Sequence, residues 1–413
     1  MTVMTRTLLE HVFSPDQLNA IFNENRQTQQ NRQWLLSSAV GLTLLVVCKI
    51  CPSLPIYQSH VESTIDSLSS LYEKLNGIDL SVSESLVRET ASKTRQVIAT
   101  FPNRGCNTIS GYRSRIVDSS KIAATDRCFK ALRKQGVDPL PGFGLVVYEP
   151  EYQLITDVVL CEDSHAQERS LFPRLLELTE ANDLWIVDQN FCCWGYLSGI
   201  AQKSGYFLIR QHAFTRWIPT TELENKGKIE TGNVFEQQGY LESPETGEQL
   251  PIRRVEVQIK TPTRDGDTVM ELFSNLPETV SATEIANAYR KRWWIETTFR
   301  ELDKLLADEI QILAYPPAAL FALCMAFVAY NIMQCITLSI ETVQPKQSLK
   351  LSTYCIGHEI ASCYYGLDIV TESHEWEWAA NMKSEEIGLF LSPLAKSVKY
   401  KNFAKRPPSK KAQ

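Results

Sequence analysis

The feature that most restricts the fold of this chain is an uncharged apolar run at residues 319–340, "ALFALCMAFVAYNIMQCITLSI". As a helix, a run of this length can cross a membrane. It also carries Asn331, Gln334 and several small residues, and the other long apolar run, residues 34–50, is shorter and contains Lys49. A chain of 413 residues with 44% hydrophobic and 22% charged residues can enclose a large core. We therefore expect a buried core helix and no membrane partner.

The periodicity of the sequence changes along the chain. Residues 1–112 have the apolar spacing of helices, and short strands begin at residue 113. The segment "GFGLVVYEPEYQLITDVVLCE" predicts a hairpin that turns at Glu149-Pro150-Glu151, and a helix is expected at about residues 166–182. "DLWIVDQNF" is a continuous apolar run, which is typical of a strand buried in the middle of a sheet, and "GYFLIRQH" is another strand. These alternations predict an α/β fold with a mixed sheet flanked by helices.

Further segments follow this core. Residues 213–277 are polar and strand-like, residues 278–345 return to helices, and residues 346–395 form a C-terminal helical region. Residues 396–413 contain seven basic residues and no acid, which predicts a disordered basic tail. Such a tail either contacts nucleic acid or only keeps the chain soluble. The formal net charge of −6 argues against a protein that coats nucleic acid over its whole surface.

The segment "YRKRWWIETTFRELDKLL", residues 289–306, reads as one amphipathic helix. At about 100° per residue, one stripe is apolar and a second stripe beside it is polar. The apolar stripe comprises Ile295, Phe299, Leu302 and Leu306, and the polar stripe comprises Tyr289, Arg292, Glu296 and Asp303. Glu296 should therefore lie at the edge of the buried face. A solvated charged face explains the same spacing equally well.

Three carboxylates stand out by their positions. Asp118 and Asp188 are expected at strand ends, and Glu296 on the helix edge. Taken singly, each aspartate could be a turn or helix-capping residue. Taken together, they could hold two divalent cations, which clamp the oxygens of a phosphoryl transfer when about 3.5–4 Å apart. Carboxylates are hard ligands, so two Mg²⁺ ions are expected, with Mn²⁺ as a substitute.

The segments "VDSS", "PLPGFGLVVYEPEYQLITDVVLCEDSHAQERSLF", "DLWIVDQNF" and "FLIRQH" and the helix at residues 289–306 carry a family resemblance. Over about residues 34–340 the sequence resembles the DDE transposases of bacterial insertion sequences, in particular the insertion-sequence-four type. The signature of that type is Tyr, two residues, Arg, three residues, Glu, six residues and Lys. Tyr289, Arg292 and Glu296 match it in register, but Asp303 stands at the lysine position with Lys304 one residue later.

This resemblance implies an RNase H-like catalytic core in two parts, residues 113–212 and 278–345, with residues 213–277 as a β-rich insertion. It implies that residues 1–112 bind DNA ends. Asp118, Asp188 and Glu296 would be the catalytic and metal-binding triad, and Tyr289, Arg292, Lys304 and Arg210 would contact DNA.

The same resemblance implies cleavage at element ends and strand transfer into target double-stranded DNA by a homodimer. A degenerate DNA-binding remnant and a nuclease that cannot join strands remain as alternatives. Trp293 and Trp294 are expected to be buried in packing rather than to stack on an extruded base. The eleven irregularly spaced cysteines fit a reduced, cytoplasmic and nucleoid-associated protein.

Overall fold

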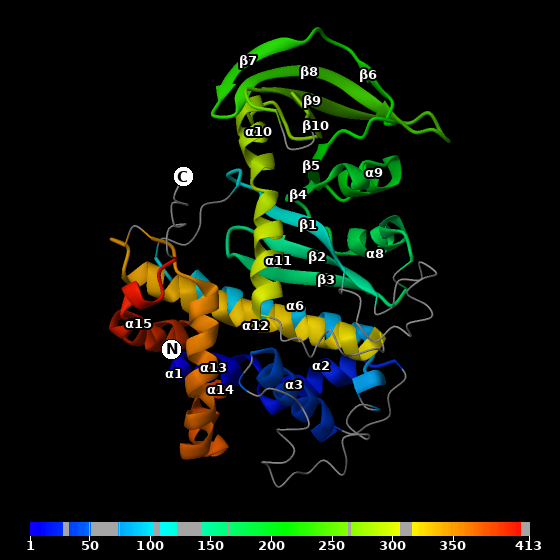
Figure 1. The fold of residues 1–413 in the computed structure, drawn as a ribbon. Coiled ribbons are helices and arrows are strands. Elements are labelled where there is room, and N and C mark those ends of the chain that lie inside the picture. Colours follow the sequence, from blue (N-terminus) through cyan, green and yellow to red (C-terminus); the bar gives the residue numbers. More distant parts are fainter. Residues whose placement is uncertain are drawn as a thin grey trace, which may run out of the picture.

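One sheet of ten strands runs through the molecule, with helices on both faces and a helical layer beneath (Figure 1). The computed structural model describes residues 1–27, 33–48, 50, 73, 75–102, 108–121, 142–163, 165–262, 266–305, 316–347 and 349–405. The strand order is β3-β2-β1-β4-β5-β10-β9-β8-β6, and β7 pairs with β8 off this path.

The first half of the sheet is the expected RNase H-like core. It contains β1 (Arg113–Lys121), β2 (Phe143–Glu149), β3 (Leu154–Cys161), β4 (Asp183–Val187) and β5 (Tyr206–Arg210). β2 is antiparallel to both β1 and β3, whereas β4 is parallel to β1 and β5 is parallel to β4. The hairpin predicted around Glu149-Pro150-Glu151 is present as β2 and β3.

The strands of residues 213–277 extend this sheet instead of forming a separate one. They are β6 (Trp217–Pro219), β7 (Glu224–Ile229), β8 (Gly232–Glu242), β9 (Gln249–Ile259) and β10 (Val269–Ser274). β10 pairs antiparallel with β5, and β9 then pairs with β10. The long β8–β9 pair arches over the top of the molecule in Figure 1.

The two faces of the core sheet bury alternate residues, as strand geometry requires. Ile116 and Ile186 pack in the cluster that the long helices cover, whereas Val117 and Trp185 pack in the other cluster. The second face is covered by α8 (Phe172–Glu177) and α9 (Trp194–Gln202), with short 3₁₀ turns η1 (Glu168–Leu171) and η2 (Gln189–Phe191) before them. The helix expected at residues 166–182 is therefore shorter than predicted.

The uncharged run forms the central helix α12 (Pro316–Val343), which crosses the first face of the sheet beside α6 (Leu80–Ala99). In the described part of the chain, α12 is the one helix long and apolar enough to span a membrane, and its apolar window is entirely buried in the protein. The expected core helix is thus present.

Side chains of α12, α6 and α8 form hydrogen bonds with the backbone at the outer edge of β3. The amide of Asn331 on α12 accepts a hydrogen bond from the Ile155 N–H (2.9 Å) and donates one to the Ile155 carbonyl (2.8 Å). Glu84 on α6 accepts from the Leu160 N–H at 2.7 Å, and Arg174 donates to the Leu160 carbonyl at 2.9 Å. The edge strand therefore has its backbone groups satisfied at both positions.

The remaining helices pack around α12. They are α1 (Thr2–Val12), α2 (Pro15–Asn25), α3 (Gln33–Val47), α13 (Thr353–Val370), η4 (Ser373–Trp376), α14 (Glu377–Asn381), α15 (Ser384–Ser397) and η5 (Tyr400–Asn402). Ser14 caps α2, because its hydroxyl accepts from the Gln17 N–H. The disorder expected from residue 396 onward does not hold for residues 396–405, which are folded; residues 406–413 lie outside the described part.

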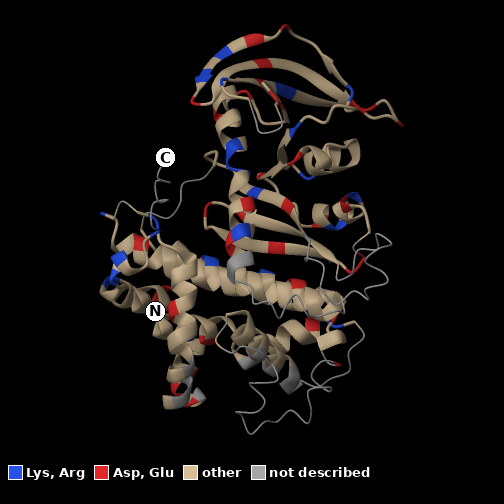
Figure 2. Ribbon diagram, viewed as in Figure 1, with Lys and Arg blue, Asp and Glu red and all other residues tan. Residues whose placement is uncertain are grey.

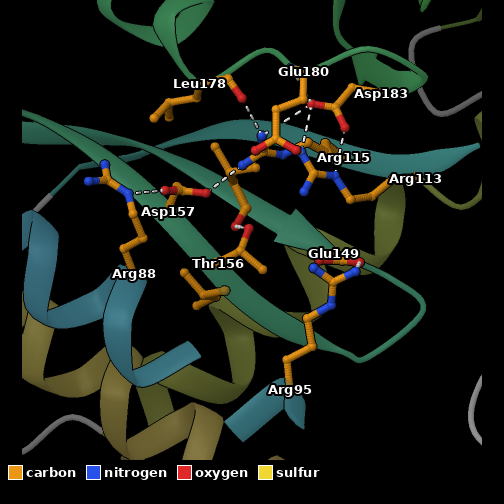
Figure 3. A network of polar contacts seen from close by, with 12 residues as sticks. Arg88, Arg95, Arg113, Arg115, Glu149, Thr156, Asp157, Leu178, Glu180 and Asp183 are labelled. Atoms are coloured by element: carbon orange, nitrogen blue, oxygen red, sulfur yellow. Dashed lines mark hydrogen bonds and ion pairs between the residues drawn. The ribbon is translucent and has the colours of Figure 1, made fainter. Parts of the chain in front are cut away.

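A buried charge network ties the start of β1 to β3 and β4 (Figure 3). Arg115, only 5% exposed, pairs with Asp157 and, at 3.3 Å, with Asp183. Arg113 lies opposite Asp183 in the strand register and pairs with it at 2.6 Å. Arg88 on α6 pairs with Asp157 at 2.7 Å, so the network also fastens this helix to the sheet.

The expected single helix at residues 289–306 is broken into α10 (Ala282–Arg290) and α11 (Trp293–Leu305). A capping box between Ser281 and Glu284 starts α10, as the sequence predicts. At the break, the Arg292 N–H bonds the Tyr289 carbonyl and the Ile295 N–H bonds the Arg292 carbonyl. These three-residue steps are tighter than an α-helical turn, and they divide the stretch into two helices.

Candidate active site

The parallel register of β1 and β4 places Asp118 and Asp188 at the same level. Ile116 pairs with Ile186, and each aspartate follows two residues later. Asp118 was expected at a strand end, and this expectation is wrong. β1 continues past Asp118 to Lys121 and stays paired with β2. β4, in contrast, stops at Val187. Asp118 therefore lies where the ladder between β1 and β4 opens, on the face covered by α11 and α12.

Neither aspartate caps a helix with its side chain. Asp188 occupies the position before the 3₁₀ turn η2, but its side chain makes no capping hydrogen bond. The Asp118 Oδ1 accepts a hydrogen bond from the N–H of Ser119 (2.9 Å), and Oδ2 faces α11. Both carboxylates are partly accessible at the end of the strands.

The start of α11 brings Arg292 and Glu296 to these aspartates. Arg292 Nη2 donates to Glu296 Oε1 at 2.9 Å, and Arg292 Nη1 lies 3.6 Å from Asp118 Oδ2. The guanidinium is 11% exposed, whereas the carboxylates of Asp118 and Glu296 are 27% and 32% exposed. The arginine is thus the inner member of the group, and the acids surround it.

The carboxylates of Glu296 and Asp188 lie close enough to Asp118 for their charges to affect its pKa. Burial raises the pKa of Asp118 to about 6; the Ser119 N–H and Arg292 oppose the rise, while the charges of Glu296 and Asp188 add to it. Burial alone would lower the pKa of Arg292, but nearby Tyr289, Asp188, Asp118 and Glu296 outweigh it and raise that pKa. Arg292 therefore pairs with Asp118 and Glu296, and the charge of Asp188 acts on it as well.

Tyr289 stands behind Arg292 and is only 3% exposed. Burial raises its pKa well above the usual range, and the charges of Arg292 and Arg210 work against that rise. Arg210, at the end of β5, pairs with Asp267 at 2.6 Å. The Tyr289 hydroxyl is buried without a hydrogen-bond partner in the described structure, so it cannot reach a surface phosphate from where it lies.

Two further predictions concern α11, one about the burial of its two tryptophans and one about Asp303 and Lys304. Trp293 and Trp294 are 58% and 41% exposed, so the expectation that they are buried is wrong. The break before α11 gives the buried face to Ile295, which is fully buried, and leaves both indoles outside. Arg292 lies 5.8 Å from the Trp293 ring, and Lys291 lies 5.4 Å from the Trp294 ring. Asp303 and Lys304 belong to α11, but their side chains lie outside the described part of the structure.

The donor set suits a divalent cation by type. Three carboxylates are hard oxygen ligands, and the mutual repulsion that helps raise the pKa of Asp118 is what a bound cation relieves. Among the residues that the structure describes, however, no three His, Cys, Asp or Glu side chains already stand close enough to share one ion. Arg292 supplies the balancing charge instead, so metal binding requires its side chain to release the acids.

The strand order β3-β2-β1-β4-β5, in which β2 is antiparallel to β1 while β4 and β5 are parallel to it, is that of an RNase H-like fold, with Asp118 within β1 and Asp188 just after β4. The family model described as "Transposase DDE domain" matches residues 109–332, more than half of the chain. The chain therefore belongs to the family of transposases with a DDE domain. No curated protein matches the sequence. Among solved structures, it is similar to a cryo-EM structure of a piggyBac transposase synaptic complex with hairpin DNA, with a TM-score of 0.41 and 11% sequence identity over 92% of this chain and 84% of that one.

Proposed function

We propose that this chain cleaves DNA at the ends of a mobile element and transfers the cut strand into target DNA. The observation that supports this proposal is the position of Arg292, which donates to Glu296 on α11 and lies 3.6 Å from Asp118 on β1, with Asp188 at the same level as Asp118 just after β4. The Tyr289, Arg292 and Glu296 spacing of the insertion-sequence-four type supports the finer assignment.

Asp118, Asp188 and Glu296 are the residues that would hold two Mg²⁺ ions, with Mn²⁺ as a substitute. Such ions supply Lewis acidity, which makes water and then a DNA 3′ hydroxyl into nucleophiles at neutral pH. The partly exposed position of the acids at the end of the strands leaves room for a phosphate beside them.

The chain's own cations would orient the DNA. Arg292, once it releases Asp118 and Glu296, presents a planar donor fork that fits two phosphate oxygens. Tyr289 would join this contact once its buried hydroxyl gains a partner, and Arg210 and Lys304 would extend the contact to neighbouring phosphates. Trp293 and Trp294 are exposed beside the acids and would stack on an extruded base.

The partners that follow from this proposal are double-stranded DNA of the element ends and of the target. A homodimer that holds two ends together, with residues 1–112 binding each end, is the expected assembly. The protein would act in the cytoplasm on the nucleoid.

A test uses the purified protein and duplexes that carry the sequences flanking the gene, with Mg²⁺ or with a chelator. We expect metal-dependent cleavage at the ends followed by joining to a target duplex, and neither product from Asp188→Asn. Asp163→Asn is the matched control, because Asp163 is an exposed aspartate away from the three acids. Full cleavage by a well-folded Asp188→Asn protein would exclude the assigned triad.

The same assay separates the second candidate, a DNA-binding remnant. Asp303 at the position of the signature lysine favours this candidate, because a carboxylate there repels phosphate. Binding of the ends without cleavage at any metal concentration would identify a remnant, and cleavage without joining would identify a nuclease.

A further inference from the structure

Two segments that are distant in sequence are joined into one surface next to α11. Residues 344–352 and 395–405 meet through an isolated bridge between Leu351 and Ala404. The Ser352 N–H donates to the Phe403 carbonyl and the Lys405 N–H donates to the Lys350 carbonyl, both at 2.7 Å. This part of the expected tail is therefore held in a fixed position.

Side chains reinforce the joint. The Tyr400 hydroxyl donates to the Leu349 carbonyl at 2.7 Å, and the Gln344 amide donates to the carbonyls of Ala395 and Val398 at 2.9 and 3.0 Å. Tyr400 and Leu351 are buried, with 6% and 3% of their surface exposed. Since the two segments are ordered by folding, a ligand that binds them does not have to order them again.

The two segments themselves carry only positive charge, although Glu301 and Glu341 lie beside them. Residues 342–352 and 387–405 contain no acidic residue. They carry six exposed lysines, which we call the lysine platform: Lys346, Lys350, Lys396, Lys399, Lys401 and Lys405. Figure 2 shows basic residues gathered around α15 and the C-terminal segment, at the left edge of the view.

Most of these lysines form no ion pair with the residues that the structure describes. Lys405 pairs with Glu301 on α11 at 2.8 Å. The other five make no ion pair with any residue of the described ranges. Five cations held close together without counter-charges repel one another, and a polyanion relieves that repulsion. The surface thus has the electrostatics of a site for a chain of phosphates.

The pair between Lys405 and Glu301 fixes the platform relative to the three acids. Glu301 is five residues beyond Glu296 on α11, which is about 7.5 Å along the helix axis at about 1.5 Å per residue. It points to another side of the helix, about 140° around, at about 100° per residue. A duplex that passes Glu296 and continues along α11 comes to the platform within about two or three phosphates, since these repeat every ~3.4 Å along a strand.

We propose that the lysine platform is a sequence-independent DNA-backbone site, separate from the three acids, that holds the duplex flanking the reacting end. The proposal rests on the proposed function only in taking DNA as the polyanion. It assigns binding to Lys346 and Lys350, which lie outside the basic tail of the sequence, together with Lys396, Lys399 and Lys401.

The experiment compares the full chain with two five-fold variants at Lys346, Lys350, Lys396, Lys399 and Lys401, one with glutamine and one with arginine. Binding to a duplex of unrelated sequence is measured by fluorescence anisotropy at several salt concentrations, with a chelator present so that no cleavage occurs. Melting temperatures of all three proteins verify that the exposed substitutions leave the fold intact.

We expect the glutamine variant to bind about tenfold more weakly at 0.1 M salt. Its plot of log affinity against log salt should be shallower by about 2 or more, at about 0.9 for each lost phosphate contact. The arginine variant keeps the charges and should retain both values. An unchanged slope in the glutamine variant overturns the proposal, and so does weaker binding to anionic lipid vesicles with unchanged DNA binding. Because the readout does not use cleavage, an inactive triad would leave this result unaffected.

Discussion

Arg292 on α11 and Asp118 on β1 face each other with 3.6 Å between Nη1 and Oδ2, and the same guanidinium donates to Glu296 at 2.9 Å. A single arginine therefore pairs with both Asp118 and Glu296. A divalent cation at these acids would take over that role, and Arg292 would be free to meet phosphate. Competition between the arginine and a metal ion is the property of this site that can be measured most directly.

Arg292→Gln should tighten binding of Mn²⁺ to the DNA-free protein by about tenfold at pH 8, because a cation close to the acids opposes a second one. Isothermal titration or the electron paramagnetic resonance of free Mn²⁺ measures this change. Lys291→Gln is the matched control, because it removes a neighbouring charge that pairs with none of the three acids in the described structure. Weaker metal binding by Arg292→Gln would show that the arginine organises the acids instead of competing for them.

Asp118→Asn should stabilise the metal-free protein at pH 8 by about 1–3 kcal/mol, since one pKa unit corresponds to about 1.4 kcal/mol. Burial raises the folded-state pKa of Asp118 from 3.8 to about 6, so the folded state disfavours the ionised carboxylate. Ionisation of Asp118 therefore does not destabilise the folded state below pH 3.8. The destabilisation grows between pH 3.8 and about 6 and is full above that range. Urea unfolding with a chelator present should give a stabilisation that is full at pH 8 and absent near pH 4.

The exposed control Asp163→Asn should give no such pH dependence. A destabilisation of Asp118→Asn that is equal at both pH values would mean that its contact with Arg292, and not its burial, dominates.

Trp293→Ala and Trp294→Ala should leave the melting temperature within about 2 °C of the wild type, because surface changes alter stability by only about 0.5 kcal/mol. Each should weaken binding to an end duplex with an unpaired terminal base by about 1–3 kcal/mol if it stacks on that base. Fluorescence of 2-aminopurine at the unpaired position reports the stacking. The buried Trp185 provides the contrast, since Trp185→Ala should lower stability by about 3–5 kcal/mol. Unchanged 2-aminopurine fluorescence in both exposed variants would exclude stacking.

Asp303→Lys should tighten binding to an end duplex and steepen the salt slope by about 0.9, as one added phosphate contact requires. Asp303 lies seven residues after Glu296 on the same helix, so the two share a stripe at about 100° per residue. Anisotropy at several salt concentrations measures both effects. If Asp303→Lys changes nothing while Lys304→Ala lowers affinity and slope, Lys304 already makes that contact.

Arg115→Ala should lower the free energy of unfolding by about 3–5 kcal/mol, because it leaves the buried Asp157 and Asp183 without their shared partner. Chemical denaturation at pH 7 measures the loss. Lys226→Ala is the control: its partner Glu224 lies 2.7 Å away at an exposed site, where solvent screens the pair, so little change in stability is expected. A loss below about 1 kcal/mol for Arg115→Ala would mean that water reaches the network.

Long or continuous apolar patterns in the sequence predicted the buried strand β4 and the core helix α12 correctly. The continuous apolar run before Asp188 is a buried strand, as its composition suggested, and the uncharged run with Asn331 is a core helix. Periodicity also predicted that Asp188 follows a strand and that Glu296 lies on a helix, but the strand end expected at Asp118 is wrong, because β1 continues to Lys121. The break at Lys291 and Arg292 could not be predicted, since helical spacing continues through it and only the tertiary fit of α11 tightens the turn. The exposure of Trp293 and Trp294 follows from that break, and so it was missed as well.

The contact between residues 344–352 and 395–405 was hidden for a different reason. A basic stretch with prolines after it has the composition of a disordered tail, and the partners that order it lie about fifty residues earlier in the chain. Composition describes a segment alone, whereas the position of Tyr400 depends on a backbone carbonyl at Leu349.

The hydrogen bonds of Asn331 and Glu84 with Ile155 and Leu160 have a consequence for assembly. A bare outer strand is a template on which a second chain can add its own strand, and this is a common route to aggregation. On β3 that route is closed at both positions, because helix side chains already occupy the backbone groups that an incoming strand needs. A second copy of this chain therefore cannot add a strand at these two positions without displacing the side chains of Asn331 and Glu84.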